Sequence, residues 1–107
     1  MVKVLIHEDS EMDLIGRYGN LARGPYDVWV YGDLPYAKML APTLRKEGFD
    51  PEQIINRNAY PDECDADIYF VDGMEGRGLE ILRRLPREKA FLNSRDPPLI
   101  KEAKEVG

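Results

Sequence analysis

A chain of 107 residues has the length of one domain, and a hydrophobic content of 43% suits a folded core rather than a disordered segment. The net charge of −5 argues against an unaided nucleic-acid surface, which needs a basic face, and against binding to an anionic membrane. Cys64 is the single cysteine, so the chain has no internal disulfide framework, and no apolar run approaches membrane-spanning length. We expect one domain over residues 1–107, located in the cytoplasm, and the charged content of 33% is typical of heat-adapted proteins.

The first unit of the chain is predicted to be a strand followed by a helix. Residues 2–7 form an apolar run, and Glu8, Asp9 and Ser10 follow it as capping and first-turn residues. Apolar side chains then recur with helical spacing over residues 14–22.

A second unit begins with residues 27–31, whose β-branched and aromatic side chains predict a strand. Residues 37–44 place apolar side chains on one helical face, and Gly48 stands at the expected end of that helix. Pro42 either bends this helix or marks a later start. Residues 53–56 form a short edge strand or one helical turn, and we favour the strand because one should follow a strand–helix unit.

The third unit starts at residues 68–71, which are apolar on both faces and therefore predict a strand in the interior of a parallel sheet. A helix that Pro86 ends should follow, and then a short strand over residues 90–92. Asp96 is an N-cap candidate for a last helix, which should extend to about Val106.

Alternation of strands and helices predicts a three-layer α/β/α domain with a mainly parallel sheet of four or five strands, Rossmann-like or flavodoxin-like. Two strand orders remain open at this stage. The strand over residues 2–7 is central in one order, as in dinucleotide-binding halves, and the strand over residues 27–31 is central in the other, as in receiver domains.

Ligands of open parallel sheets bind beyond the carboxyl ends of the strands, where this chain places several polar residues. They are His7, Glu8, Asp9, Gly32, Asp33, Asp72, Gly73, Asn93 and Ser94. One interpretation is a Mg²⁺ site built from Asp9, Asp33 and Asp72, because Mg²⁺ prefers oxygen ligands. The other is helix capping, since Asp and Ser at these turns bond to the backbone N–H groups of the following helix.

Two further features admit a functional and a structural interpretation. Gly73, Gly76 and Gly78 could let backbone N–H groups approach a phosphate, but their spacing matches neither G-x-G-x-x-G nor the Walker A motif, and a flexible turn is the alternative. His7, the single histidine, is a candidate general base or ligand at its strand end, or a packed residue of the core.

Residues 30–35 and the helix after them resemble the first strand–helix unit of response-regulator receiver domains. Residues 68–82 look like the phospho-acceptor strand and following helix of that family, in which an Asp ends the strand. Asp72 stands in that place, and Ser94 falls where the family has Ser or Thr after the next strand. The resemblance covers about residues 27–107 and implies a Mg²⁺-dependent phospho-acceptor, with Asp72 as the candidate catalytic residue.

The chain departs from the receiver pattern in two respects. Receivers have two adjacent acids after their first strand, and here Gly32 stands in place of one of them; their final strand ends in Lys, and no strand is expected after the last helix here. Residues 2–23 would have to supply the missing unit as a permuted piece. Such losses fit a pseudo-receiver, or the same architecture reached by convergence.

These observations predict a small binding or regulatory module without catalysis, because no complete catalytic constellation is present. The alternative is a Mg²⁺-dependent phospho-acceptor or small phosphoryl-transfer enzyme that uses the acids at the strand ends. Tyr26, Trp29, Tyr31 and Tyr36 crowd one region, where they either pack in the core or form an interface. We expect a protein partner or a second copy of the chain, as a homodimer, to be bound.

Overall fold

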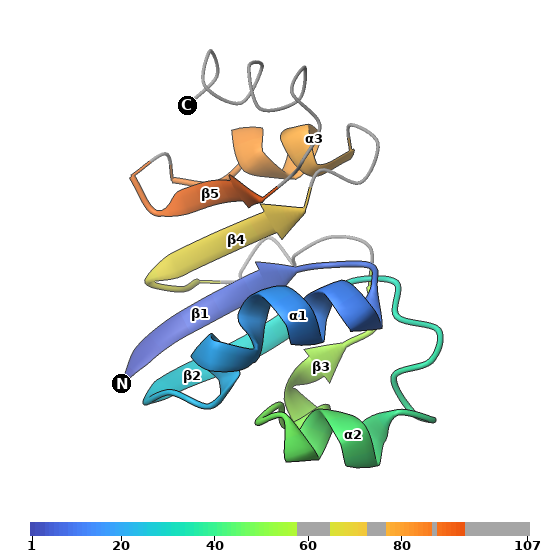
Figure 1. Cartoon of the computed structure of the whole chain (residues 1–107). Helices are drawn as coiled ribbons and strands as arrows, with labels where there is room; N and C mark the ends of the chain where they lie inside the picture. Colours follow the sequence, from blue (N-terminus) through green and yellow to red (C-terminus); the bar gives the residue numbers. More distant parts are fainter. Residues whose placement is uncertain (58–64, 73–76, 87, 94–107) are drawn as a thin grey trace.

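The structure, a computed structural model, describes residues 1–57, 65–72, 77–86 and 88–93. Its centre is a five-stranded sheet with the order β3-β2-β1-β4-β5, in which every pairing is parallel. The strands are β1 (Val2–His7), β2 (Tyr26–Tyr31), β3 (Ile54–Ile55), β4 (Ile68–Asp72) and β5 (Ala90–Asn93). The predicted parallel α/β fold is thus confirmed, with β4 in the interior and β1 at the centre (Figure 1). The order with β2 at the centre is not observed.

Helices lie on both faces of the sheet, which gives three layers. The helices are α1 (Glu11–Ala22), α2 (Ala41–Lys46) and α3 (Arg77–Arg83). Side chains of α1 and α2 pack with Val4 and Ile6 of β1, whereas Leu82 of α3 packs on Val71 of β4. Leu5 belongs to the cluster on the same side as α3, because successive side chains of a strand point to opposite faces.

The predicted helix over residues 37–44 starts later than its apolar spacing suggests. Helix α2 begins at Ala41, with Pro42 in its first turn and turns in place of a helix before it. Proline lacks the N–H that a helix interior needs but is tolerated in the first turn, so Pro42 marks the start of the helix. Gly48 has a φ of 101°, the left-handed conformation that ends many helices.

Both interpretations of residues 53–56 are partly realised. Residues Pro51–Gln53 form a 3-10 turn, and Ile54–Ile55 then pair with β2 as the short edge strand β3. The expected last helix, from Asp96 to Val106, lies outside the described residues. No helix within the described part of the chain is long and apolar enough to cross a membrane.

The four clustered aromatic residues divide between the core and the surface. Tyr31 is buried, and Trp29 packs beside it against the cluster that contains Leu5. Tyr26 and Tyr36 are exposed by 37% and 56%, so this second pair is accessible to a partner.

Candidate functional site

The strand order reverses between β1 and β4, and this is where open α/β sheets bind their ligands. From β1 the chain passes through α1 to β2 on one side, while β4 lies on the other side of β1. The helices that follow these two strands, α1 and α3, accordingly pack on opposite faces of the sheet. Glu8 and Asp9 after β1, and Asp72 at the end of β4, stand at this switch point.

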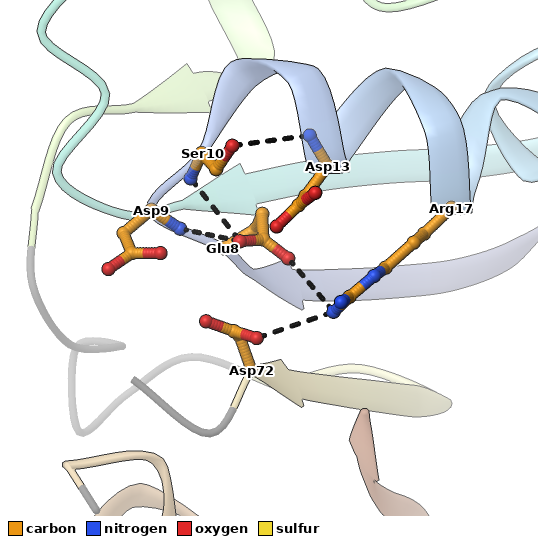
Figure 2. A network of polar contacts seen from close by, with 6 residues as sticks. All are labelled: Glu8, Asp9, Ser10, Asp13, Arg17 and Asp72. Carbon is orange, nitrogen blue, oxygen red and sulfur yellow. Dashed lines mark hydrogen bonds and ion pairs between the residues drawn. The ribbon is translucent and has the colours of Figure 1, made fainter. Parts of the chain in front are cut away.

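Three carboxylates meet at this point. Glu8 and Asp9 follow β1, and Asp72 is the last residue of β4. One oxygen of each lies within 4.8 Å of the others, so the group could hold a metal ion (Figure 2). We call Glu8, Asp9 and Asp72 the acidic group.

Glu8 is the buried member of the acidic group, with an exposed fraction of 0%. Its backbone N–H donates to the carbonyl oxygen of Tyr31 at 3.1 Å, which extends the ladder between β1 and β2 by one residue. The Oε1 atom accepts hydrogen bonds from the backbone N–H groups of Asp9 at 3.1 Å and Ser10 at 3.2 Å (Figure 2). The Oε2 atom accepts no hydrogen bond from the described residues.

This environment makes the negative charge of Glu8 costly. Burial raises the pKa of Glu8 from 4.5 to about 8, and the neighbouring carboxylate of Asp72 contributes to the rise. The hydrogen bonds from Ser10 and Asp9 act in the opposite direction but are too weak to offset it. Near neutral pH, Glu8 therefore either holds a proton or needs a positive charge beside its free oxygen.

Arg17 supplies a positive charge at the edge of the acidic group. Its Nη1 atom lies 3.4 Å from Oδ1 of Asp72 and 3.9 Å from Oε2 of Glu8. The first distance is that of a long hydrogen bond, and the second is an ion pair without one. Arg17 comes from the second turn of α1, so the helix that follows the loop of Glu8 supplies the cation beside it (Figure 2).

Helix capping is confirmed for Ser10 among the predicted capping residues. Ser10 is the N-cap of α1, and its hydroxyl accepts a hydrogen bond from the backbone N–H of Asp13 at 3.2 Å. Asp9 lies one residue earlier, outside the helix, with its carboxylate in the acidic group. For Asp72 the start of the next helix falls partly outside the described residues, so capping is not decided there.

Asp33 is exposed and does not join the acidic group, in contrast to the expected trio of Asp9, Asp33 and Asp72. The reason is the strand order, because β2 and β4 lie on opposite sides of β1 and are about 9.6 Å apart. The loop after β2 is also held toward β3, since Asn56 accepts a hydrogen bond from the backbone N–H of Leu34 at 3.0 Å. Glu8 takes the place that the sequence interpretation gave to Asp33.

The remaining candidate residues lie either in the core or outside the described residues. His7 is fully buried at the end of β1, as expected for a packed histidine. Gly73, Gly76 and Ser94 lie outside the described residues, so the phosphate-loop interpretation is not tested. Arg17 was missed by sequence reasoning, because its partner Asp72 is 55 residues away and no local pattern links the two.

Comparisons with protein-family models, with curated proteins and with solved structures find no significant match for this chain. Oxygen-only ligands favour hard cations such as Mg²⁺ and Ca²⁺. Oxygens bonded to one Mg²⁺ ion at about 2.1 Å lie at most about 4.2 Å apart, so the three oxygens, which lie within 4.8 Å of one another, must draw slightly together to hold the ion.

Proposed function

We propose that the protein is a small regulatory module that binds Mg²⁺ at Glu8, Asp9 and Asp72 and accepts a phosphoryl group on Asp72. The observation that carries this proposal is the convergence of three carboxylates at the switch point of the sheet, one of them buried with an oxygen that accepts no hydrogen bond from the described residues. Three such charges repel one another, and a divalent cation removes that cost.

The arrangement also supports a receiver-like function, but the two adjacent acids come from a different strand end than the sequence resemblance assigned. Receivers place two adjacent acids beside the phospho-acceptor Asp, and Glu8 and Asp9 stand beside Asp72 in that manner. Glu8 and Asp9 thus provide the two adjacent acids, of which Gly32 and Asp33 supplied only one. With β1 at the centre of the sheet, no permuted unit is required.

Asp72 is better suited than Glu8 to accept a phosphoryl group, because its side chain is 16% exposed whereas that of Glu8 is buried, and it ends β4 as the phospho-acceptor Asp of the sequence resemblance ends its strand. In the proposed step, a carboxylate oxygen of Asp72 attacks phosphorus and forms an O–P bond. The bond between phosphorus and the leaving oxygen of the donor breaks, and the leaving group departs with that electron pair. The cation neutralises charge on the transferring phosphoryl oxygens.

The test measures cation binding and acylphosphate formation separately. Isothermal titration with MgCl₂ should show binding to the wild-type protein and strongly weakened binding to Asp72→Asn. Asp33→Asn is the matched control, since Asp33 is a strand-end carboxylate outside the acidic group, and it should bind as the wild type does. Incubation with acetyl phosphate and Mg²⁺ should add the mass of one phosphoryl group to the wild type and to Asp33→Asn alone. Absence of Mg²⁺ binding would overturn the proposal, and binding without phosphorylation would reduce it to a cation-binding module.

A second candidate is a binding module without catalysis, and the position of Arg17 favours it. The guanidinium already lies beside Asp72 and Glu8, so the fold provides a positive charge of its own. A module of this kind would keep the acidic group as a structural feature and would show no response to Mg²⁺. The titration above separates the two candidates.

We further propose that the module acts in the cytoplasm on a protein partner or a second copy of itself. A single cysteine suits a compartment in which disulfides do not form. Tyr36 is exposed by 56%. It lies near the start of α1, because its backbone N–H donates to Oε1 of Glu11 at 2.8 Å. Sedimentation at several concentrations tests self-association, and a monomer at high concentration would contradict the homodimer.

A further inference from the structure

Arg17 occupies a position that a bound divalent cation would also need. Its Nη1 atom approaches the same two side chains, Asp72 and Glu8, that contribute oxygens to the acidic group. In Figure 2 the side chain extends from α1 toward the gap between these carboxylates. The contact joins β4 to the helix that follows β1, across the switch point of the sheet.

We propose that Arg17 is an internal competitor of the divalent cation: its guanidinium holds the acidic group when no metal is bound and withdraws when the metal enters. This inference rests on the proposed cation site and adds its regulation. It makes the position of the Arg17 side chain on α1 a readout of whether the site is occupied.

Simultaneous binding of both cations is disfavoured by distance and charge. A Mg²⁺ ion would lie about 2.1 Å from the oxygens of Asp72 and Glu8. A guanidinium nitrogen at 3.4 Å and 3.9 Å from these same side chains would then be only a few Å from a doubly charged ion. Like charges at such separations repel one another even in water, and more strongly where water is partly excluded.

The surroundings of Arg17 allow it to withdraw. Its side chain is 20% exposed and is carried by the surface of α1, so a change of rotamer can bring the guanidinium to solvent without unfolding the helix. Asp13 lies one helical turn earlier, at the spacing where opposite charges on a helix attract. Asp13 is exposed and offers the released guanidinium an alternative partner (Figure 2).

The competition predicts that removing the charge of Arg17 strengthens metal binding. Isothermal titration with MgCl₂ should give about tenfold tighter binding for Arg17→Gln than for the wild type, a size typical of coupling between sites. Arg17→Lys keeps a positive charge and should restore most of the wild-type affinity. Arg23→Gln is the matched control, because Arg23 follows the same helix but pairs with Glu47 at 3.1 Å, and its affinity should be unchanged.

An NMR measurement on the wild-type protein tests the withdrawal directly. The Nε–Hε resonance of Arg17 should shift as MgCl₂ is added. At saturation, its Hε proton should exchange with water as fast as that of a solvent-exposed arginine. This readout does not depend on whether the Arg17→Gln variant folds.

The outcomes distinguish this inference from the proposed function. If the wild type binds Mg²⁺ and Arg17→Gln binds it equally or more weakly, Arg17 is no competitor, and the cation site itself survives. If neither protein binds Mg²⁺, the cation site and the competition both fail. If Arg17→Gln binds and the wild type does not, the competition is supported, and the native module is the metal-free one.

Discussion

Gly32 lies so close to Glu8 that a Cβ atom at position 32 would overlap the carbonyl oxygen of Glu8. This close contact fixes the end of β2 against the loop after β1, which carries Glu8 of the acidic group. The backbone N–H of Gly32 donates to the carbonyl oxygen of Ile55 at 3.2 Å, so the residue is held from the other side by β3. Gly32 is therefore needed for packing beneath the site, and its lack of a side chain is a condition for the position of Glu8.

Substitution of Gly32 should consequently destabilise the protein. Gly32→Ala would force the loop of Glu8 away from β2 and should lower the free energy of unfolding by about 1–3 kcal/mol, as overpacking does elsewhere. Gly16→Ala is the matched control, because Gly16 is inside α1 with nothing within 4 Å of an added Cβ. That change should stabilise the protein by about 0.5–1 kcal/mol, since alanine is the better helix former. Urea unfolding of both variants measures the difference, and equal stabilities would contradict the role assigned to Gly32.

The elements of the fold could be predicted from the sequence because their signals are local. The apolar run over β1 and the run over β4 each predicted their strands almost to the residue. Gly48 marked the end of α2 through a backbone constraint that does not depend on the rest of the chain, whereas Pro42 left its start open between a bend and a later beginning. The set of polar residues at the strand ends could be predicted for the same reason.

The composition of the acidic group could not be predicted, because it depends on which strands are neighbours. Asp33 and Glu8 both follow a strand, and only the order β2-β1-β4 brings Glu8, and not Asp33, beside Asp72. Hydrophobic patterns left two strand orders open and so could not choose between them. The burial and raised pKa of Glu8 follow from this arrangement, and neither property has a signal in the local sequence.

The N-cap of α1 provides a test of the loop that presents the acidic group. Ser10→Ala removes the hydroxyl that accepts the N–H of Asp13, and it should lower the free energy of unfolding by about 1 kcal/mol. The backbone N–H of Ser10, which donates to Glu8, is retained, so Mg²⁺ affinity should change little. Ser10→Asp keeps an acceptor for the cap and should recover most of the stability. A loss of metal affinity larger than the loss of stability would show that the hydroxyl itself contributes to the site.

A buried hydrogen bond at the start of β4 predicts a second stability effect. The hydroxyl of Tyr69 accepts a hydrogen bond from the backbone N–H of Ala66 at 2.8 Å in the interior. Tyr69→Phe keeps the ring but leaves this N–H without its acceptor, which should cost about 1–3 kcal/mol. Tyr26→Phe is the control, because Tyr26 is 37% exposed and water can replace its contacts. Denaturant unfolding that shows the same stability for both variants would argue against the buried bond.

The raised pKa of Glu8 predicts how stability depends on pH without metal. The unfolded chain releases the Glu8 proton near pH 4.5, whereas the folded protein keeps it until about pH 8. Between these values the folded state binds more protons than the unfolded state, so the contribution of Glu8 to stability falls as pH rises. The slope should approach about 1.4 kcal/mol per pH unit for one proton. The comparison of wild type with Glu8→Gln in the presence of EDTA isolates this residue, and parallel curves for the two proteins would contradict the assignment.

Mg²⁺ should offset this trend, because the ion and the proton compete for the carboxylate of Glu8. At pH 4.5 the folded protein holds the Glu8 proton, so the ion must displace it before it can bind. Near pH 8 half of the folded molecules have lost this proton, and the ion then also relieves the repulsion between Glu8 and Asp72. The rise in melting temperature caused by millimolar MgCl₂ should therefore grow steadily over this range of pH, since preferential binding to the native state stabilises it. Glu8→Gln has no proton to displace, so its smaller rise should stay constant over the same range. A Mg²⁺ effect of equal size at every pH in the wild type would place the ion away from Glu8.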